Sequence, residues 1–260
     1  MQGTIEPKVR CFQRTNARAW TDQGASARES MSFLAFSGLL LLTFVGCTGY
    51  REDLGYDHPV EYSWSEPGTP GEFSLFEGVA WDGAIAPSAT SLLATQSLVE
   101  NRKVLDLFSG PGVIAVLCGY ENAKQVLSIA ESDLAVACTR YNVAAHQHDA
   151  VVKVQPFDPT ASPPIPSSDR FDIILTTFSI TRDDAGPLPT SDRVKVLLQG
   201  VDGNLEFSGR AFAICEDGAT VEMLTAACTE AEKELVLATT DATRWPVYEI
   251  KSSKTTVGEP

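Results

Sequence analysis

Histidine and paired cysteines are scarce in this chain. Its 260 residues include three histidines and six cysteines, and no two cysteines have the C-x-x-C spacing of a zinc site. A zinc site is therefore not expected, and we expect His146 and His148 to lie on the surface. Four cysteines lie inside apolar segments, where cysteine acts as a small buried hydrophobic residue. These four are Cys118, Cys138, Cys215 and Cys228.

Positive charge is also scarce. The chain has 20 lysines and arginines against 34 acidic residues, which gives a formal net charge of −14. Nucleic-acid affinity comes largely from basic side chains that neutralise phosphates, and the sequence contains no basic run. Nucleic acid is therefore an unexpected partner. A protein or a small molecule is the expected substrate.

No apolar run is long enough for a standard transmembrane helix, which needs about 20 residues. Residues 33–45 form an uncharged, mostly apolar run of 13 residues, which fits the apolar region of a signal peptide. The run leads into Phe-Val-Gly-Cys, ending at Cys47, which resembles a bacterial lipobox. The alternative is a buried or surface-docking helix of a soluble enzyme, and both interpretations stay open.

Composition divides the chain into four parts. Residues 1–30 are polar, and we expect a disordered extension or a stretch upstream of the true start. Residues 31–47 are the signal-like or anchor-like segment, and residues 48–82, rich in glycine, proline and acids, predict a linker and an irregular lead-in. Residues 83–260 are the expected folded domain. The protein is expected to be cytoplasmic or membrane-associated, or an exported lipoprotein if Cys47 is lipidated.

Short apolar strands alternate with helices from about residue 86. The expected strands are 103–108, 125–130, 151–155, 171–177, 209–216, 234–240 and 247–251. The expected helices are 88–101, 112–118, 133–147, 191–200 and 220–233, with Gly200 ending the fourth. This alternation predicts an α/β fold, a doubly wound and mostly parallel seven-stranded sheet with helices on both faces. The last strand is expected to be antiparallel, because no helix separates it from the strand before it.

The stretch KVLDLFSGPGVIAV, residues 103–116, joins the first of these strands to a helix through a glycine turn. Its glycines, Gly110 and Gly112, let the backbone approach a ligand and leave helix-terminal N–H groups facing it. Asp106 precedes the turn, and its carboxylate would repel the pyrophosphate of NAD. S-adenosylmethionine has a sulfonium and an amino group and no phosphate, so it suits this acid. A tight turn without any ligand is the alternative.

At these residues the chain resembles the class I S-adenosylmethionine-dependent methyltransferases. The segment VLDLFSGPGVIAV matches their first motif, a hydrophobic strand followed by D-x-F/G-x-G-x-G, and the likeness extends from about Gly83 to Lys251. The resemblance implies a Rossmann-like fold and S-adenosyl-L-methionine as cofactor. It assigns cofactor contacts to Asp106, Phe108, Gly110, Gly112, Glu131, Asp158 and Thr176.

Two of these assignments carry alternatives. The family places a ribose-binding acid at the end of the second strand, a position that falls on Ala130 here. We assign the role to the next residue, Glu131, although a solvent-facing glutamate is the alternative. Asp158 follows the third strand, where the family often binds the adenine amine, but it also suits the opening of a loop before Pro159.

The sequence indicates the acceptor of the methyl group less clearly than it indicates the cofactor. The fourth strand ends in Thr176-Thr177 rather than in the N-P-P-Y motif of nitrogen methyltransferases, and Asp183 and Asp184 follow as candidate substrate contacts. Methyl transfer to a good nucleophile needs in-line approach in a dry pocket rather than acid–base groups, so no catalytic residue is assigned. The expected function is methyl transfer to a protein side chain or a small molecule. The alternative is a non-catalytic binding protein with this fold.

Overall fold

The structure is a computed structural model. It describes residues 54, 57–67, 69–83, 85–158, 160–161, 165, 168–178, 189–215, 218–238 and 245–252. Backbone contacts divide the chain into Met1–Cys47 and Thr48–Pro260, and every described residue belongs to the second unit. The apolar segment 31–47 with Cys47, and the acids Asp183 and Asp184, lie outside the described residues.

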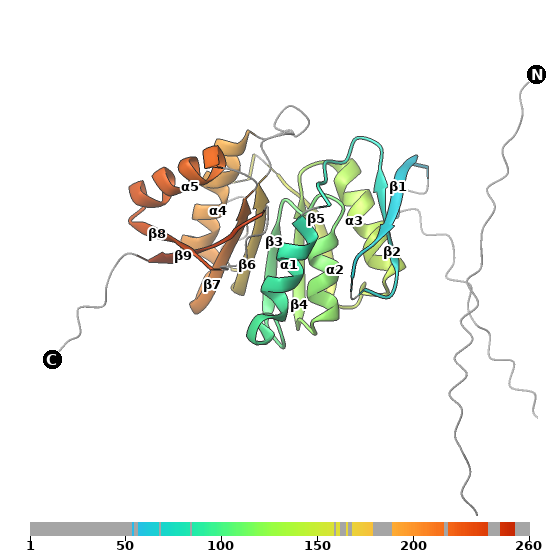
Figure 1. Cartoon of the computed structure of the whole chain (residues 1–260), viewed down its shortest axis with the longest axis horizontal. Coiled ribbons are helices and arrows are strands. Elements are labelled where there is room, and N and C mark those ends of the chain that lie inside the picture. The colour runs from blue at the N-terminus through green and yellow to red at the C-terminus, as the bar shows by residue number, and fades with distance from the viewer. Residues whose placement is uncertain are drawn as a thin grey trace, which may run out of the picture. The chain divides into compact units, whose positions relative to one another are not determined.

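Seven strands of the described chain form one sheet in the order β5-β4-β3-β6-β7-β9-β8 (Figure 1). The strands are β3 Lys103–Leu107, β4 Gln125–Ala130, β5 Val152–Pro156, β6 Phe171–Phe178, β7 Leu205–Cys215, β8 Lys233–Leu237 and β9 Val247–Ser252. Neighbours from β5 to β7 pair in parallel, and β9 runs antiparallel to both β7 and β8. The predicted doubly wound sheet with an antiparallel last strand is confirmed.

Helices cover both faces of the sheet, because its central strands are apolar on both sides. The helices are α1 Ile85–Ala94, α2 Val113–Tyr120, α3 Asp133–Ala145, α4 Thr190–Asn204 and α5 Gly218–Glu230, with a short 3-10 turn at Thr95–Ser97. The first three pack in one hydrophobic core and the last two in the other. The four cysteines predicted to be buried are buried.

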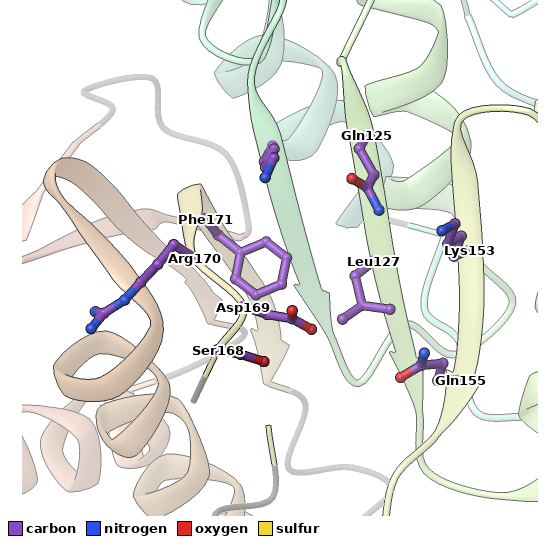
Figure 2. A pocket seen from close by; sticks show the side chains of 9 residues that line it. Gln125, Leu127, Lys153, Gln155, Ser168, Asp169, Arg170 and Phe171 are labelled. Atoms are coloured by element: carbon purple, nitrogen blue, oxygen red, sulfur yellow. The ribbon is translucent and has the colours of Figure 1, made fainter. Parts of the chain in front are cut away.

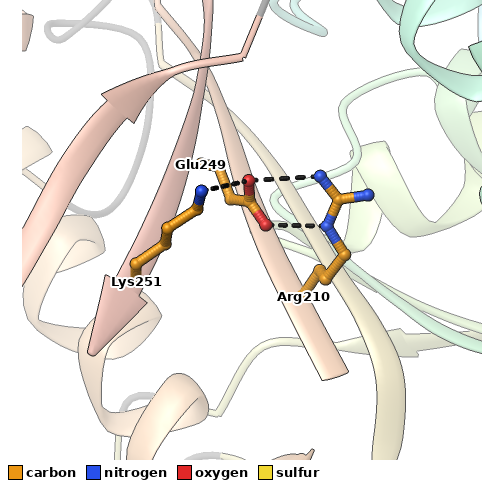
Figure 3. Close-up of polar contacts among 3 residues, drawn as sticks. All are labelled: Arg210, Glu249 and Lys251. Atoms are coloured by element: carbon orange, nitrogen blue, oxygen red, sulfur yellow. Dashed lines mark hydrogen bonds and ion pairs between the residues drawn. The ribbon is translucent and has the colours of Figure 1, made fainter. Parts of the chain in front are cut away.

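Strand β9 is also tied to β7 by charge. The guanidinium of Arg210 donates two hydrogen bonds to the Glu249 carboxylate, Nε to Oε1 at 2.7 Å and Nη2 to Oε2 at 3.1 Å. The ammonium of Lys251 lies 3.4 Å from the same carboxylate (Figure 3). A bidentate pair of this kind fixes the approach of the two side chains, and it supports the antiparallel pairing.

The lead-in expected at 48–82 is not irregular throughout. Strands β1 Val60–Ser65 and β2 Glu72–Phe76 form an antiparallel hairpin, and β2 packs on α3 (Figure 1). Side chains of β2 are buried in the core that α1–α3 share, with Phe73 and Leu75 fully buried. Pro67, Pro70 and Gly71, which are part of the proline- and glycine-rich stretch that suggested a linker, lie in the connection between these two strands.

Two further expectations were wrong. His146 is 6% exposed rather than on the surface, since its ring stacks on Phe73 at 4.3 Å and its Nδ1 lies 2.9 Å from the hydroxyl oxygen of Tyr120. Helix α4 continues past Gly200 to Asn204. A Cβ at Gly200 would lie 3.2 Å from Cδ1 of Ile165, so this glycine serves close packing rather than helix termination. None of the described helices is both long and apolar enough to span a membrane.

Candidate active site at the carboxyl edge of the sheet

The glycine turn between β3 and α2 needs both of its glycines. Gly110 and Gly112 have φ values of 54° and 82°, in the left-handed region that favours glycine. A Cβ at Gly112 would lie 2.6 Å from Cγ2 of Thr139, and one at Gly110 would lie 2.9 Å from the carbonyl oxygen of Ala80. Real Cβ atoms do not approach other atoms so closely. The turn is therefore packed against its neighbours with no room for a side chain.

Helix α3 holds the turn through two buried polar side chains. The hydroxyl of Thr139 donates to the carbonyl oxygen of Gly110 at 2.9 Å, and Nδ2 of Asn142 donates to that of Pro111 at 2.8 Å. Asn142 also bonds both backbone groups of Ser74 in β2, each at 2.8 Å. One asparagine thus joins the glycine turn to the hairpin. Sequence reasoning missed both residues, whose signal is two polar residues three apart on the buried face of a helix.

Phe108 begins the turn in a conformation that is unusual for a bulky residue. Its φ is 63°, and its side chain is 5% exposed. Backbone strain of this kind costs about 1–3 kcal/mol and is concentrated at functional sites. The ring meets Phe157 edge-on, with centroids 5.8 Å apart, and Phe157 follows the end of β5 directly. The carboxyl ends of β3 and β5 are thereby connected by two aromatic rings.

Asp106 lies in β3 beneath the turn and is 1% exposed. The hydroxyl of Ser128, its neighbour in β4, donates to Oδ2 at 3.1 Å. Within the described chain, Oδ1 has no hydrogen-bond partner. Burial raises the pKa of Asp106 to about 7, and the Ser128 hydrogen bond opposes the rise. A buried carboxyl group with one unused oxygen remains able to bind a cationic donor.

Strand β4 ends at the fully buried Ala130, and Glu131 is the next residue. Its carboxylate binds the guanidinium of Arg193 in the first turn of α4, with Nε to Oε1 at 2.7 Å and Nη2 to Oε2 at 3.0 Å. The side chains are 15% and 11% exposed. The guanidinium carbon also lies 5.8 Å from the ring centroid of Phe108. Glu131 after β4, Arg193 in α4 and Phe108 after β3 therefore lie close together at the carboxyl edge of the sheet.

Asp158 and Thr176 have local partners. Oδ1 of Asp158 accepts hydrogen bonds from the backbone N–H of Thr160 at 2.8 Å and from its hydroxyl at 2.6 Å, which lower the pKa of this exposed carboxyl. This arrangement fits the alternative stated above, in which Asp158 opens a loop. Thr176 is fully buried in β6, and its hydroxyl donates to the carbonyl oxygen of Leu107 at 3.3 Å. Both residues thus shape the backbone near the carboxyl edge.

A cavity of about 470 Å³ lies elsewhere on the sheet (Figure 2). It is lined by Lys103, Gln125, Leu127, Lys153, Gln155 and residues 168–171. Lys103, Gln125 and Phe171 are the first residues of their strands, so this cavity lies toward the amino edge. None of the predicted site residues lines it. Among the described residues, no cluster of three or more histidine, cysteine, aspartate or glutamate side chains could hold a metal ion.

The chain matches one family model, the methyltransferase small domain, over residues 78–182. This range includes the glycine turn, Glu131 and Asp158, and it ends before α4 begins. None of the curated proteins matches the chain.

Solved structures share the fold at low sequence identity. The protein SMU.776, in complex with SAH, is 16% identical with a TM-score of 0.53, over 74% of this chain and 56% of that one. A tRNA m1G37 methyltransferase from M. jannaschii is 16% identical with a TM-score of 0.50, over 74% and 57%. A ribosomal protein L11 methylase from Lactobacillus delbrueckii subsp. bulgaricus is 19% identical with a TM-score of 0.49, over 68% and 83%.

The chain spans little more than half the length of the first two of these proteins, and identities this low establish the fold alone. All of the predicted site residues, from Asp106 to Thr176, lie within the matched range. The match over residues 78–182 and the seven-stranded sheet both agree with the resemblance to the class I S-adenosylmethionine-dependent methyltransferases.

Proposed function

We propose that this enzyme transfers the methyl group of S-adenosyl-L-methionine to a protein side chain or a small molecule, at the carboxyl edge of β3, β4 and β6. The observation that carries the proposal is Asp106. Its carboxyl group is buried beneath the glycine turn and has an oxygen without a partner among the described residues. A pyrophosphate would be repelled there, whereas the amino group of the cofactor would supply the missing donor, directly or through a water molecule.

The neighbouring residues suit the remaining parts of the cofactor. Gly110 and Gly112 let the turn adopt its left-handed backbone conformation, from which backbone N–H groups would face a ligand. Glu131 offers two carboxylate oxygens to the two ribose hydroxyls. The ring of Phe157, half-buried beside Phe108, offers an apolar face for adenine, with Asp158 next to it. We propose that Thr176 acts indirectly, because its hydroxyl holds the carbonyl at the end of β3.

When bound, the cofactor supplies an electrophilic methyl group, which a nucleophile attacks in line as the carbon–sulfur bond breaks and its electron pair stays on sulfur. The protein's contribution is alignment and exclusion of water, so no acid or base is required of it. The net charge of −14 disfavours a polyanionic acceptor. For this reason we favour a protein or small-molecule acceptor, even though one structural neighbour is a tRNA methyltransferase.

Two measurements test the proposal. Calorimetric titration of the full chain with S-adenosylhomocysteine and with NADH should give binding to the first ligand alone. Incubation of a cell extract with methyl-labelled S-adenosylmethionine should then label material that resists nuclease. Gly112→Ala, which closes the turn, is the control that should transfer no label. Binding of neither ligand at millimolar concentration would support a non-catalytic protein with this fold, and label released by nuclease would show a nucleic-acid acceptor.

Attachment to a membrane through residues 31–47 is a separate proposal, supported by the apolar run and the Phe-Val-Gly-Cys sequence alone. Export would separate the enzyme from a cofactor made in the cytoplasm, so we favour a cytoplasmic or membrane-associated location. Mass spectrometry of the native N-terminus tests this. A lipidated Cys47 at the new terminus would establish the lipoprotein, and an intact chain beginning at or before Met31 would exclude it.

A further inference from the structure

Helix α4 brings a positive charge to the acid that we assign to the ribose. Arg193 lies in the first turn of α4, and Glu131 lies 62 positions earlier, directly after β4. The two side chains meet through two contacts, at 2.7 and 3.0 Å, one on each carboxylate oxygen. The Nη2–Oε2 contact has hydrogen-bond geometry, and the Nε–Oε1 contact is an ion pair without it.

A ribose would need the same two oxygens. Two neighbouring hydroxyl groups bind a carboxylate by donating one hydrogen bond to each oxygen, and here a guanidinium nitrogen already lies at 2.7 or 3.0 Å from each of them. The side chains of Glu131 and Arg193 are only 15% and 11% exposed, so little open surface remains on the carboxylate for a second pair of donors. Arginine and ribose are thus competitors for one acceptor.

The position of the Arg193 guanidinium also favours competition between Arg193 and the ribose. Its central carbon lies 5.8 Å from the ring centroid of Phe108, the residue that opens the glycine turn. The guanidinium therefore lies close both to Glu131, which follows β4, and to Phe108, which follows β3. When displaced from Glu131, the guanidinium can keep its contact with the aromatic ring.

We infer that Arg193 sets the affinity for the cofactor by competing with its ribose for Glu131. The inference rests on the proposed function, because it takes Glu131 as the ribose acid. The ligand-free enzyme is held in a closed pairing, and only the fraction of molecules with a released Glu131 binds the cofactor fully. The measured dissociation constant is raised in proportion.

The test is calorimetric titration of the full chain with S-adenosylhomocysteine. Arg193→Met keeps a long side chain without the charge, and we expect it to bind about fivefold more tightly than wild type, because a partly buried ion pair no longer competes. Lys195→Met is the matched control. It removes a positive charge from the same helix, but Lys195 pairs with Asp192 and its side chain is 70% exposed, so its affinity should stay unchanged.

A second pair of variants separates competition from a general effect on folding. In Glu131→Gln, exchange of Arg193 for Met should give no gain, because the charged partner is already absent. Thermal unfolding of each variant verifies that it is folded. Wild-type protein that binds no S-adenosylhomocysteine would overturn the proposed function. Wild-type protein that binds it as tightly as, or more tightly than, Arg193→Met would overturn this inference alone.

Discussion

Helices α3 and α4 both contact the carboxyl edge of the sheet, but they do so with different chemistry. Helix α3 presents Thr139 and Asn142, two short neutral side chains that are fully buried and bonded to backbone groups of the glycine turn. Helix α4 presents Arg193, a long charged side chain bonded to another side chain. A short buried side chain has few rotamers, whereas arginine has many rotamers and can exchange its partner.

The two helices therefore have different roles at the site. The turn and α3 form a rigid half, whose geometry is set before any ligand arrives. The pairing of α4 with Glu131 forms an exchangeable half, whose state sets how tightly the cofactor binds. The predictions below test this difference, beginning with the rigid half, where we expect the largest effects.

Gly112→Ala should have the largest effect. The added Cβ would lie 2.6 Å from Cγ2 of Thr139, at a φ of 82° that alanine tolerates poorly. We expect a loss of about 2–4 kcal/mol in the free energy of unfolding, together with loss of S-adenosylhomocysteine binding. Gly218→Ala is the control, since its Cβ meets nothing within 4 Å. Denaturant unfolding and calorimetry measure both effects, and a Gly112→Ala protein that binds normally would show that the turn is not rigid.

Asn142→Leu comes next. Leucine has the same branched shape but a larger volume, and it leaves the backbone N–H and carbonyl of Ser74, and the carbonyl of Pro111, without this partner. We expect a destabilisation of about 2–4 kcal/mol, because these groups are buried. Thr225→Ala, which removes an exposed hydroxyl bonded within its own helix, should change the unfolding free energy little. Equal melting temperatures for Asn142→Leu and wild type would contradict the role of this residue.

In the exchangeable half, Glu131→Ala should weaken S-adenosylhomocysteine binding about tenfold or more, which corresponds to a lost charged hydrogen bond of about 1.5–3 kcal/mol. The unfolding free energy should change less than in the two variants above. Glu222→Ala removes the same charge from an exposed position on α5 and should bind like wild type. Unchanged affinity in Glu131→Ala would remove this residue from the site.

Thr176→Val should have the smallest effect. Valine keeps the shape of the buried side chain but cannot donate to the carbonyl oxygen of Leu107. A destabilisation of about 1 kcal/mol and an affinity within about twofold of wild type are expected for the loss of one hydrogen bond that positions the backbone. A tenfold loss of S-adenosylhomocysteine affinity at unchanged stability would instead show that the hydroxyl contacts the cofactor.

Much of the rigid half could be predicted from the sequence. The apolar strand, Asp106 and the two glycines are adjacent in the chain, so local pattern alone placed them together, and the alternation of strands and helices predicted the sheet. The partners of the turn could not be found in this way. Asn142 bonds Ser74 across 68 positions, and Arg193 reaches Glu131 across 62. Such contacts depend on how the helices pack, which no local pattern records.

The wrong expectations have the same origin. The segment before β2 is rich in proline and glycine, and it was predicted to be a linker. Both hairpin strands are short, β1 is mostly exposed, and β2 is buried through its packing against α3. Gly200 predicted a helix end, but in the folded chain it makes room for Ile165. His146 is buried because the hairpin covers the end of α3. In each case tertiary contacts overrode a local signal.

The most direct test of the central claim is the pH dependence of S-adenosylhomocysteine binding. Burial raises the pKa of Asp106 to about 7 in the folded, ligand-free protein. In the unfolded chain this carboxyl group already loses its proton near pH 4, so its contribution to folding stability falls as the pH rises from about 4 to about 7. An ammonium ligand favours the ionised form. Wild-type affinity should therefore rise with pH through about 7 and then level off, while Asp106→Asn should bind weakly at every pH. If wild type and Asp106→Asn bind with equal affinity across this range, Asp106 does not hold the cofactor and the account is wrong.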